Sequence, residues 1–299
     1  MSAAYGGNGM SDGLDVTVVL PVFNGERTIR DELAAIIGQI TRFSFELVVV
    51  DNDSNDSTAA IVDALSATDP RVRRVLAPDH HNLSYVRNVG VASARGRYVL
   101  FCDDDDIVDP GWMQAMATGL TEHRLVASRM EYSYLNPPEV MRGRAEFQSE
   151  GLADLFGYVV SNGAIGVHRE LWNSLGGNDE HLGVAGEDFD FAIRAQRDAG
   201  VAPVFIDTAI YHYRQRAGAM STWTQARRYG RSHVALYRRY GHGRVDLSAE
   251  RKRAVREWWW IVTRSPLLIR PHCRVRWARK AGMRVGRLIG SFKERVVYL

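Results

Sequence analysis

The sequence predicts an α/β fold in which a mostly parallel central sheet is flanked by helices. Short β-branched apolar runs alternate with amphipathic stretches along the first hundred residues, the pattern of parallel strands joined by crossover helices. The runs at 16–22 and 45–50 are continuously apolar, as in strands that are buried on both faces. Beyond residue 213 only helical patterns remain, so we expect a C-terminal helical extension.

Each element of the first hundred residues follows from its own pattern. After the first apolar run, Ile29, Leu33 and Ile36 recur at helical spacing. After the second run, Ser57 or Thr58 suits the cap of another helix. In chain order we predict a strand at 16–22, a helix at 27–40, a strand at 45–50, a helix at 57–65, a strand at 73–77, a helix at 83–94 and a strand at 98–102.

The second part of the chain has a less regular pattern. We predict a strand at 126–132, a helix at 152–160, a strand at 164–168, a helix at 187–199, a strand at 203–213, and helices at 223–240, 249–262 and 273–296. The chain therefore divides into a flexible N-terminus (1–14) rich in Gly, Ser and Asn, an α/β domain (15–215), and a basic helical region (216–299).

The charge is distributed unevenly between these regions. Residues 214–299 hold 22 Lys and Arg against 4 acidic residues, whereas residues 1–213 hold 16 against 31. Two interpretations of the basic helices stay open. They can lie on an anionic membrane, where the tryptophans at 258–260 suit the interfacial zone. They can also pack on the acidic α/β domain, whose charge they nearly balance.

Several protein classes are excluded by the composition. No apolar run reaches the roughly 18 residues needed to cross a bilayer. Residues 1–13 lack the basic and apolar regions of a signal peptide, so we expect a cytoplasmic protein that has access to the inner face of the plasma membrane. Cys102 and Cys273 lie in dissimilar sequence, and we expect neither a disulfide nor a cysteine-ligated zinc.

Four consecutive aspartates form the sharpest chemical signal. Asp103, Asp104, Asp105 and Asp106 directly follow a predicted buried strand, where their mutual repulsion calls for a cation. Mg²⁺ and Mn²⁺ bind through one or two carboxylates and complete their coordination with water and substrate phosphates. A solvated acidic turn is the alternative. Ligands of open α/β sheets bind beyond the carboxyl ends of the strands, which favours the metal.

Two further motifs follow strand ends. Asp51, Asn52 and Asp53 come after the second strand, where such side chains can accept a hydrogen bond from a ribose hydroxyl or a pyrimidine N–H. An Asx-turn that feeds a helix cap explains the same residues. Arg87, in the first half of the helix after the third strand, is placed to reach a phosphate, although a lone Arg on a helix is more often a solvated surface residue.

The order of these motifs resembles that of the family-two glycosyltransferases, which have the nucleotide-binding fold called GT-A. The resemblance covers roughly residues 15–215. Four stretches match: VVLPVFNG (18–25), VDNDSNDST (50–58), the segment 82–90 with its Arg-Asn pair and Gly90, and FCDDDD (101–106). Further along the chain, Arg169, Gly176, Gly177 and the Gly-Glu-Asp triplet at 186–188 also match.

The resemblance implies a role for individual residues on the donor side. Asp105 is implied as the direct metal ligand, and Asp103 as a second ligand that also turns toward the donor ribose. Asn52 departs from the family, which usually has an Asp there, and this leaves the base open. The other residues implied in nucleotide binding are Pro21, Phe23, Asn24, Asp51, Asp53, Arg87 and Asp104, and Asp106 is implied as support.

On the acceptor side, the resemblance implies Asp188 as the catalytic base, with Glu187 beside it. A sugar hydroxyl is a poor nucleophile, and a carboxylate in hydrogen-bond reach removes its proton as attack on the anomeric carbon develops. The alternative for this acid pair is stabilisation of a helix N-terminus. His212, after the last strand, either completes the metal coordination or has a structural role.

The sequence thus predicts a metal-dependent, inverting glycosyltransferase of cell-envelope polysaccharide or glycolipid synthesis. Its partners would be a nucleotide-diphosphate sugar and a glycan or lipid-linked acceptor, with peripheral contact to an anionic membrane and no nucleic acid. A nucleotidyltransferase that makes nucleotide sugars is one alternative, but the stretch at 21–25 lacks the phosphate loop usual for that class. An arginine-rich polyanion-binding protein is the other, and it leaves the aspartates without a role.

Overall fold

The computed structural model describes residues 13–144, 150–161, 164–182, 185–265 and 270–298. The first part of the chain contains β1 (Val16–Val22), α1 (Ile29–Ile37), β2 (Phe45–Asp51), α2 (Thr58–Ser66), β3 (Val72–Leu76), α3 (Leu83–Ala92), β4 (Tyr98–Phe101), β5 (Ile107–Val108), α4 (Trp112–Glu122) and β6 (Leu125–Glu131). There follow α5 (Pro138–Arg144), β7 (Leu152–Leu155), β8 (Tyr158–Ser161), β9 (Ile165–His168), α6 (Arg169–Ser174), α7 (Glu187–Ala199), β10 (Val204–His212), α8 (Ala219–Leu236), a π-helical turn (Tyr237–Gly241), α9 (Leu247–Thr263) and α10 (Pro271–Glu294).

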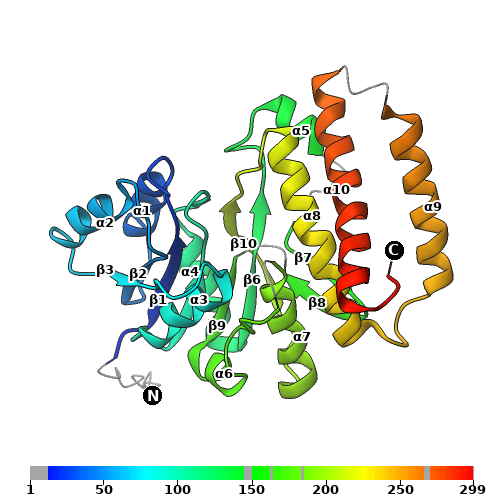
Figure 1. Ribbon diagram of the computed structural model, residues 1–299. Helices are drawn as coiled ribbons and strands as arrows, with labels where there is room; N and C mark the ends of the chain where they lie inside the picture. Colours follow the sequence, from blue (N-terminus) through cyan, green and yellow to red (C-terminus); the bar gives the residue numbers. More distant parts are fainter. Residues whose placement is uncertain (1–12, 145–149, 162–163, 183–184, 266–269, 299) are drawn as a thin grey trace, which may run out of the picture.

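The central sheet is mixed but mostly parallel where the predicted site lies. Its strand order is β3-β2-β1-β4-β9-β6-β10-β5. Strands β1 to β4 are mutually parallel, and β9 runs antiparallel to both β4 and β6. The carboxyl ends of β1, β2 and β4 therefore meet at one edge, as the sequence predicts. Figure 1 shows the sheet crossing the molecule, with α1 and α2 near its β3 edge and α8 to α10 at the far side.

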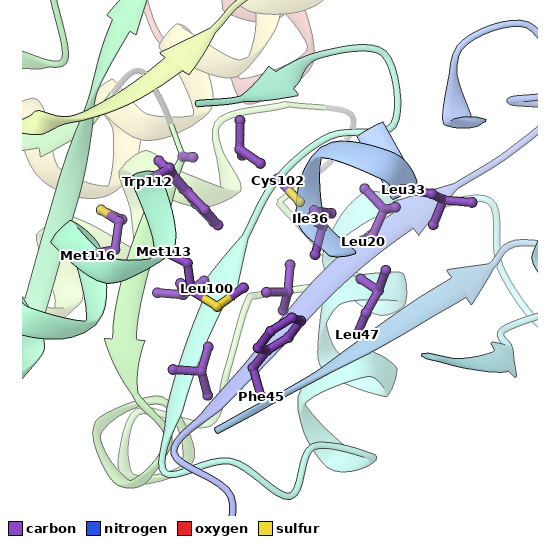
Figure 2. Packing of buried hydrophobic residues seen from close by; sticks show 14 of the residues in the cluster. Leu20, Leu33, Ile36, Phe45, Leu47, Leu100, Cys102, Trp112, Met113 and Met116 are labelled. Atoms are coloured by element: carbon purple, nitrogen blue, oxygen red, sulfur yellow. The ribbon is translucent and has the colours of Figure 1, made fainter. Parts of the chain in front are cut away.

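The hydrophobic core explains why this edge is rigid. All seven residues of β1 and all seven of β2 are buried. Figure 2 shows Leu20 and Leu47 of these strands packed near Ile36 of α1, with Met113 of α4 beside Leu100. This packing fixes the strand ends, so side chains that directly follow the strands are held on a stable base.

One prediction about secondary structure is wrong. Residues 152–160 were predicted as a helix, but they form the antiparallel hairpin of β7 and β8. Its turn places Phe156 and Gly157 at φ 59° and 78°, and the Asp154 carboxylate accepts a hydrogen bond from the Gly157 N–H at 3.2 Å. Turn chemistry overrides the helical spacing of the apolar residues here.

The C-terminal helices α8 and α10 pack tightly together against the α/β domain. A Cβ at Gly230 of α8 would collide with the Met283 carbonyl, and one at Gly286 of α10 would collide with the Arg227 carbonyl. Only glycine permits backbones this close. These two glycines hold α8 and α10 against each other, and Leu236 of α8 lies in one buried cluster with Ile193 of α7. Helix α9 is the outermost helix in Figure 1. Within the described ranges, no helix is both long and apolar enough to span a bilayer.

Candidate active site

The aspartate turn after β4, residues 103–106, is fixed at both ends by β10 and the loop that follows it. The Tyr211 hydroxyl accepts a hydrogen bond from the Asp103 N–H at 3.0 Å. Asp106 is buried, and its Oδ1 accepts from the Arg214 N–H at 2.5 Å. The Arg214 side chain donates to the Asp105 carbonyl at 2.6 Å. The four aspartates are thus held by residues more than a hundred positions later in the chain.

The carboxyls of this turn oppose one another's ionisation. Burial and the charges of Asp105 and Asp103 raise the pKa of Asp104 to about 7. Burial and Asp103 also raise the pKa of Asp105, against which the charges of Arg216 and Arg214 act. A bound divalent cation would relieve this repulsion.

No preformed metal cage exists at the turn. Across the residues that the structure describes, no three His, Cys, Asp or Glu side chains converge on a common point. Among the residues that the structure describes, the buried Asp106 Oδ2 atom has no hydrogen-bond partner within 3.5 Å. One or two carboxylates with open positions fit Mg²⁺ or Mn²⁺, which usually keep water and substrate phosphate oxygens as their other ligands.

Arg87 of α3 joins the aspartate turn to the acid pair at the start of α7. Its Nη2 atom donates to Asp103 Oδ1 at 3.2 Å, and its Nη1 atom donates to Glu187 Oε1 at 3.0 Å. Burial opposes the charge of this guanidinium, but Asp103, Glu187 and Asp188 together raise its pKa. The structure therefore brings together three sequence-predicted residues that lie up to a hundred positions apart.

In the described part of the chain, Asp188 pairs with no arginine, whereas its neighbour Glu187 pairs with Arg87. Burial, followed by the charge of Glu187, raises the pKa of Asp188 to about 7, although Arg87 acts in the opposite direction. The backbone N–H of Phe189 donates to its carboxylate at 2.9 Å. Both Glu187 and Asp188 line a cleft of about 840 Å³ together with Asp103 and Asp105. A carboxyl with a pKa near neutrality in a cleft is suited to accept a proton.

Asp51 and Asn52 lie at the end of β2, directly beside β1. Asp51 pairs in register with Val22, and its carboxylate accepts from the Ser54 N–H at 2.9 Å and from Arg74 at 3.3 Å. The Asn52 amide donates to the carbonyls of Ala77 and His80 at 2.5 and 2.9 Å. Because its N–H groups are engaged in this way, the remaining Oδ1 atom can act as an acceptor, as an aspartate would.

The other predicted nucleotide residues occupy the loop after β1 and the turn after β2. Phe23 is 50% exposed, and its ring centroid lies 5.0 Å from that of His81. Asn24 and Asp53 both have positive φ, at 54° and 64°. Pro21 is buried in β1. Its neighbours Phe23 and Asn24, in the loop after β1, are exposed to solvent. These residues lie at the same sheet edge but outside the residues that line the cleft.

His212 does not join the aspartates. Its Nδ1 atom lies 3.0 Å from Glu131 Oε2, its ring stacks 4.4 Å from Tyr134, and it is absent from the cleft lining. Side chains alternate along β10, so Tyr211 and Tyr213 face the cleft while His212 faces away. We therefore leave His212 out of the metal ligands proposed below.

Sequence reasoning missed one side of the cleft. Tyr213, Gln225 and Tyr229 line it, together with the arginines Arg144, Arg214, Arg216, Arg228 and Arg279. For the residues after position 212 the sequence signal is the excess of basic residues there, which does not say which side chains face inward, and Arg144 lies outside that region.

The sequence is similar to that of known and putative glycosyltransferases. Residues 17–171, just over half of the chain, match the profile of Glycosyl transferase family 2. The chain is 27% identical over 215 residues to the putative glycosyltransferase EpsH of Bacillus subtilis (strain 168), covering 67% of this chain and 60% of the relative. It is 36% identical over 102 residues to the succinoglycan biosynthesis protein ExoO of Rhizobium meliloti (strain 1021), which covers 34% of this chain and 28% of the relative. The chain thus spans less than two thirds of the length of these relatives.

Solved structures confirm the fold. A mannosyltransferase from Pyrobaculum calidifontis, in complex with GDP-Man and Mn²⁺, superposes with a TM-score of 0.60 at 17% identity, covering 94% of this chain and 88% of that one. TarS 1–349 of S. aureus gives a TM-score of 0.53 at 19% identity, covering 96% and 93%. The predicted GT-A fold is therefore confirmed, and with the profile match across the sheet and the aspartate turn, the chain belongs to glycosyl transferase family 2.

Proposed function

We propose that this protein transfers a sugar from a nucleotide-diphosphate sugar to an acceptor hydroxyl, with inversion at the anomeric carbon. The observation that carries the proposal is the Arg87 bridge, which sets the aspartate turn next to the acid pair of α7. A donor diphosphate at the turn and an acceptor hydroxyl at Asp188 would then meet within one cleft.

The proposed base is Asp188. In its ionised form this carboxylate accepts the proton of the acceptor hydroxyl while the oxygen forms a bond to the anomeric carbon and the bond to the diphosphate breaks. One base on the acceptor side and a leaving group on the other describe a single displacement, which inverts the centre. Glu187 stays paired with Arg87 and acts as a positioning residue.

Mn²⁺ or Mg²⁺ is the proposed cofactor, with Asp105 and Asp103 as its protein ligands. When bound, such an ion neutralises the negative charge that develops on the departing diphosphate. Arg214 donates to the Asp105 carbonyl and so keeps the turn in one conformation. Support comes from the structurally similar mannosyltransferase, which was solved in complex with GDP-Man and Mn²⁺.

The ends of β1 and β2 are the proposed site for the nucleoside. Asp51 and the Asn52 Oδ1 atom supply hydrogen-bond acceptors, and the exposed Phe23 ring supplies a stacking surface. Asp104, from the aspartate turn, packs against Gly25 of the loop that carries Phe23. Among the similar proteins, ExoO is named for succinoglycan biosynthesis and GgaB of Bacillus subtilis for minor teichoic acid biosynthesis. These names support a cell-envelope glycan or its lipid-linked precursor as the acceptor.

The outer face of α9 is the proposed contact with an anionic membrane. Val255, Trp259 and Val262 recur at helical spacing and are 69%, 71% and 65% exposed. Both acids of the helix, Glu250 and Glu257, turn toward α10 and pair with Arg287 and Arg284. The exposed basic residues around the apolar stripe are Arg251, Lys252, Arg256 and Arg264. An exposed face of this kind suits a surface of anionic lipid.

Cosedimentation with vesicles tests this contact. The protein should bind vesicles that contain phosphatidylglycerol and should not bind vesicles of phosphatidylcholine alone, and Trp259→Ser should reduce the bound fraction. Met220→Ser, which removes another exposed apolar side chain at 76% exposure on α8, serves as the matched control. Equal binding of both variants would remove α9 from the membrane contact.

A nucleotide screen tests the transferase proposal. We expect one nucleoside diphosphate and its sugar conjugates to raise the melting temperature, and to raise it further with Mn²⁺, because a ligand that binds only the folded state stabilises it. Nucleoside triphosphate with sugar phosphate should release no pyrophosphate, which separates this enzyme from a nucleotidyltransferase. A protein that no nucleotide stabilises, with or without the metal, would refute the proposal.

A further inference from the structure

The cleft has a cationic side that donor chemistry does not require. Arg144 of α5, Arg228 of α8 and Arg279 of α10 line it, and we call these three residues the arginine wall. Tyr229 lines the same cleft as Asp188, Glu187 and Arg279. Burial raises the pKa of Tyr229 most, the charges of Asp188 and Glu187 raise it further, and the charge of Arg279 lowers it. The wall is therefore near the proposed base.

Arg144 differs from the other buried arginines. Three arginine side chains are less than 9% exposed among the described residues: Arg144, Arg284 and Arg287. Arg284 pairs with Glu257 at 2.6 Å, and Arg287 pairs with Glu250 at 3.0 Å. Arg144, which is 3% exposed, has no carboxylate within 4.0 Å in the described part of the chain. A buried charge without a counter-charge is costly, and function is the usual reason for one to persist.

The hydrogen bonds of Arg144 confirm that its charge is not neutralised. Its Nη2 atom donates to the Arg216 carbonyl at 2.7 Å and to Thr222 Oγ1 at 2.6 Å, and its Nη1 atom donates to Gln225 Oε1 at 3.4 Å. All three acceptors are neutral, and Nε has no partner among the described residues. Burial and the nearby charge of Arg279 lower its pKa. These contacts hold the guanidinium in place while leaving the local positive charge for a ligand.

We propose that the arginine wall binds a phosphate group carried by the acceptor, so that the acceptor of this enzyme is a phosphate-bearing molecule. The inference rests on the proposed function and names its acceptor class. A phosphate carries up to two charges and has oxygens for several guanidinium donors, more than a carboxylate offers.

The donor diphosphate does not account for the wall. In the proposed function that diphosphate lies at the aspartate turn, where Arg214 and Arg216 are the arginines whose charges act on Asp105. The wall instead comes from α5, α8 and α10, three elements outside the strands that carry the nucleotide residues. A separate anionic group near Asp188 is therefore needed, and the acceptor is the substrate that lies there.

The experiment titrates phosphate compounds into protein whose donor site is filled. With saturating nucleoside diphosphate and Mn²⁺, calorimetry measures the Kd of glycerol 1-phosphate, geranyl phosphate and inorganic phosphate, with glycerol and acetate as uncharged and carboxylate comparisons. We expect the phosphate compounds to bind and the comparisons not to bind. Tighter binding of geranyl phosphate than of glycerol 1-phosphate would assign the phosphate to a lipid, and equal binding would assign it to a soluble glycan.

Arg228→Gln and Arg279→Gln should each weaken the binding of these phosphates about tenfold, the loss expected for a charge-assisted hydrogen bond. Arg227→Gln is the matched control. Arg227 is exposed on α8 next to Arg228, but it does not line the cleft. The Kd of the nucleoside diphosphate itself should not change in any variant. Arg144 is left intact since it ties α5 to α8.

Two results would overturn the inference. If Arg228→Gln and Arg279→Gln weaken the binding of the nucleoside diphosphate as much as the binding of the phosphates, the arginine wall belongs to the donor site. If the phosphates do not bind, or if Arg227→Gln has the same effect, no phosphate site exists there. The same titrations without nucleotide separate this failure from that of the proposed function, since phosphate binding to a protein that binds no nucleotide would refute only the transferase proposal.

Discussion

The aspartate turn after β4 and the acid pair at the start of α7 carry the same chemical group in different surroundings. In the turn, burial and neighbouring carboxylates raise the pKa values of Asp104 and Asp105 together. In the pair, Glu187 is bound to Arg87, and burial and the charge of Glu187 raise the pKa of Asp188 to about 7. The first arrangement favours a cation that is shared between carboxylates, and the second leaves one carboxyl poised to exchange a proton.

We infer from this difference that the two regions have separate tasks within one cleft. Arg87 contacts both regions, because it pairs with one carboxylate of each, Asp103 of the turn and Glu187 of the acid pair. Variants of the two regions should therefore fail in different ways. Variants of the acid pair should lose the rate of transfer, and variants of the aspartate turn should lose metal-dependent donor binding.

The largest expected effect is on the acid pair. Asp188→Asn keeps the shape of the side chain but removes the proton acceptor, so kcat should fall by about 10²- to 10⁴-fold, the usual contribution of a general base. Transfer rates and donor Kd would be measured on the same preparation, and the donor Kd should stay within about twofold because Asp188 does not hold the diphosphate. A variant that loses donor binding together with rate would place Asp188 in the donor site instead.

A smaller effect is expected from pH. Asp188 must be ionised to act as a base, and its pKa is about 7, so kcat should rise about tenfold per pH unit below that value and level off above it. Burial is the main reason that the pKa of Asp188 is high; the charges of Glu187 and Asp103 raise it further, and that of Arg87 lowers it. Rates would be measured from pH 5.5 to 9 at saturating Mn²⁺ and donor.

Glu187→Gln sharpens that pH measurement. It removes the neighbouring negative charge that raises the pKa of Asp188, so the midpoint of the profile should move to lower pH. A midpoint that does not move, or that moves to higher pH, would show that another group controls the profile.

Much of the fold was predictable from local patterns. The predicted strand at 16–22 and the predicted helix at 187–199 coincide with β1 and α7, because each has a strong apolar pattern and a clear boundary residue. The hairpin at 152–161 was not predictable from spacing, since a turn with Phe156 at positive φ determines it. The short strand β5 has only two residues and leaves no periodic signal.

The site was predictable only where consecutive residues build it. The aspartate turn is visible in the sequence because its members are adjacent and follow a strand. The contacts of Arg87 with Glu187, and of Arg144 with Thr222, join residues 100 and 78 positions apart, and no pattern specifies such pairs. The position of His212 depends on strand alternation: a shift of one residue along β10 would have turned it toward the cleft.

The central claim is that the aspartate turn holds the donor diphosphate through a divalent ion. Calorimetry with the nucleoside diphosphate that stabilises the protein best, in Mn²⁺ and then in EDTA, tests it most directly. For the unaltered protein, removal of the metal should weaken binding by at least about tenfold, whereas Asp105→Ala should bind equally weakly in both conditions. Affinity that is the same with and without the metal in the unaltered protein, or a metal effect that survives in Asp105→Ala, would contradict the claim.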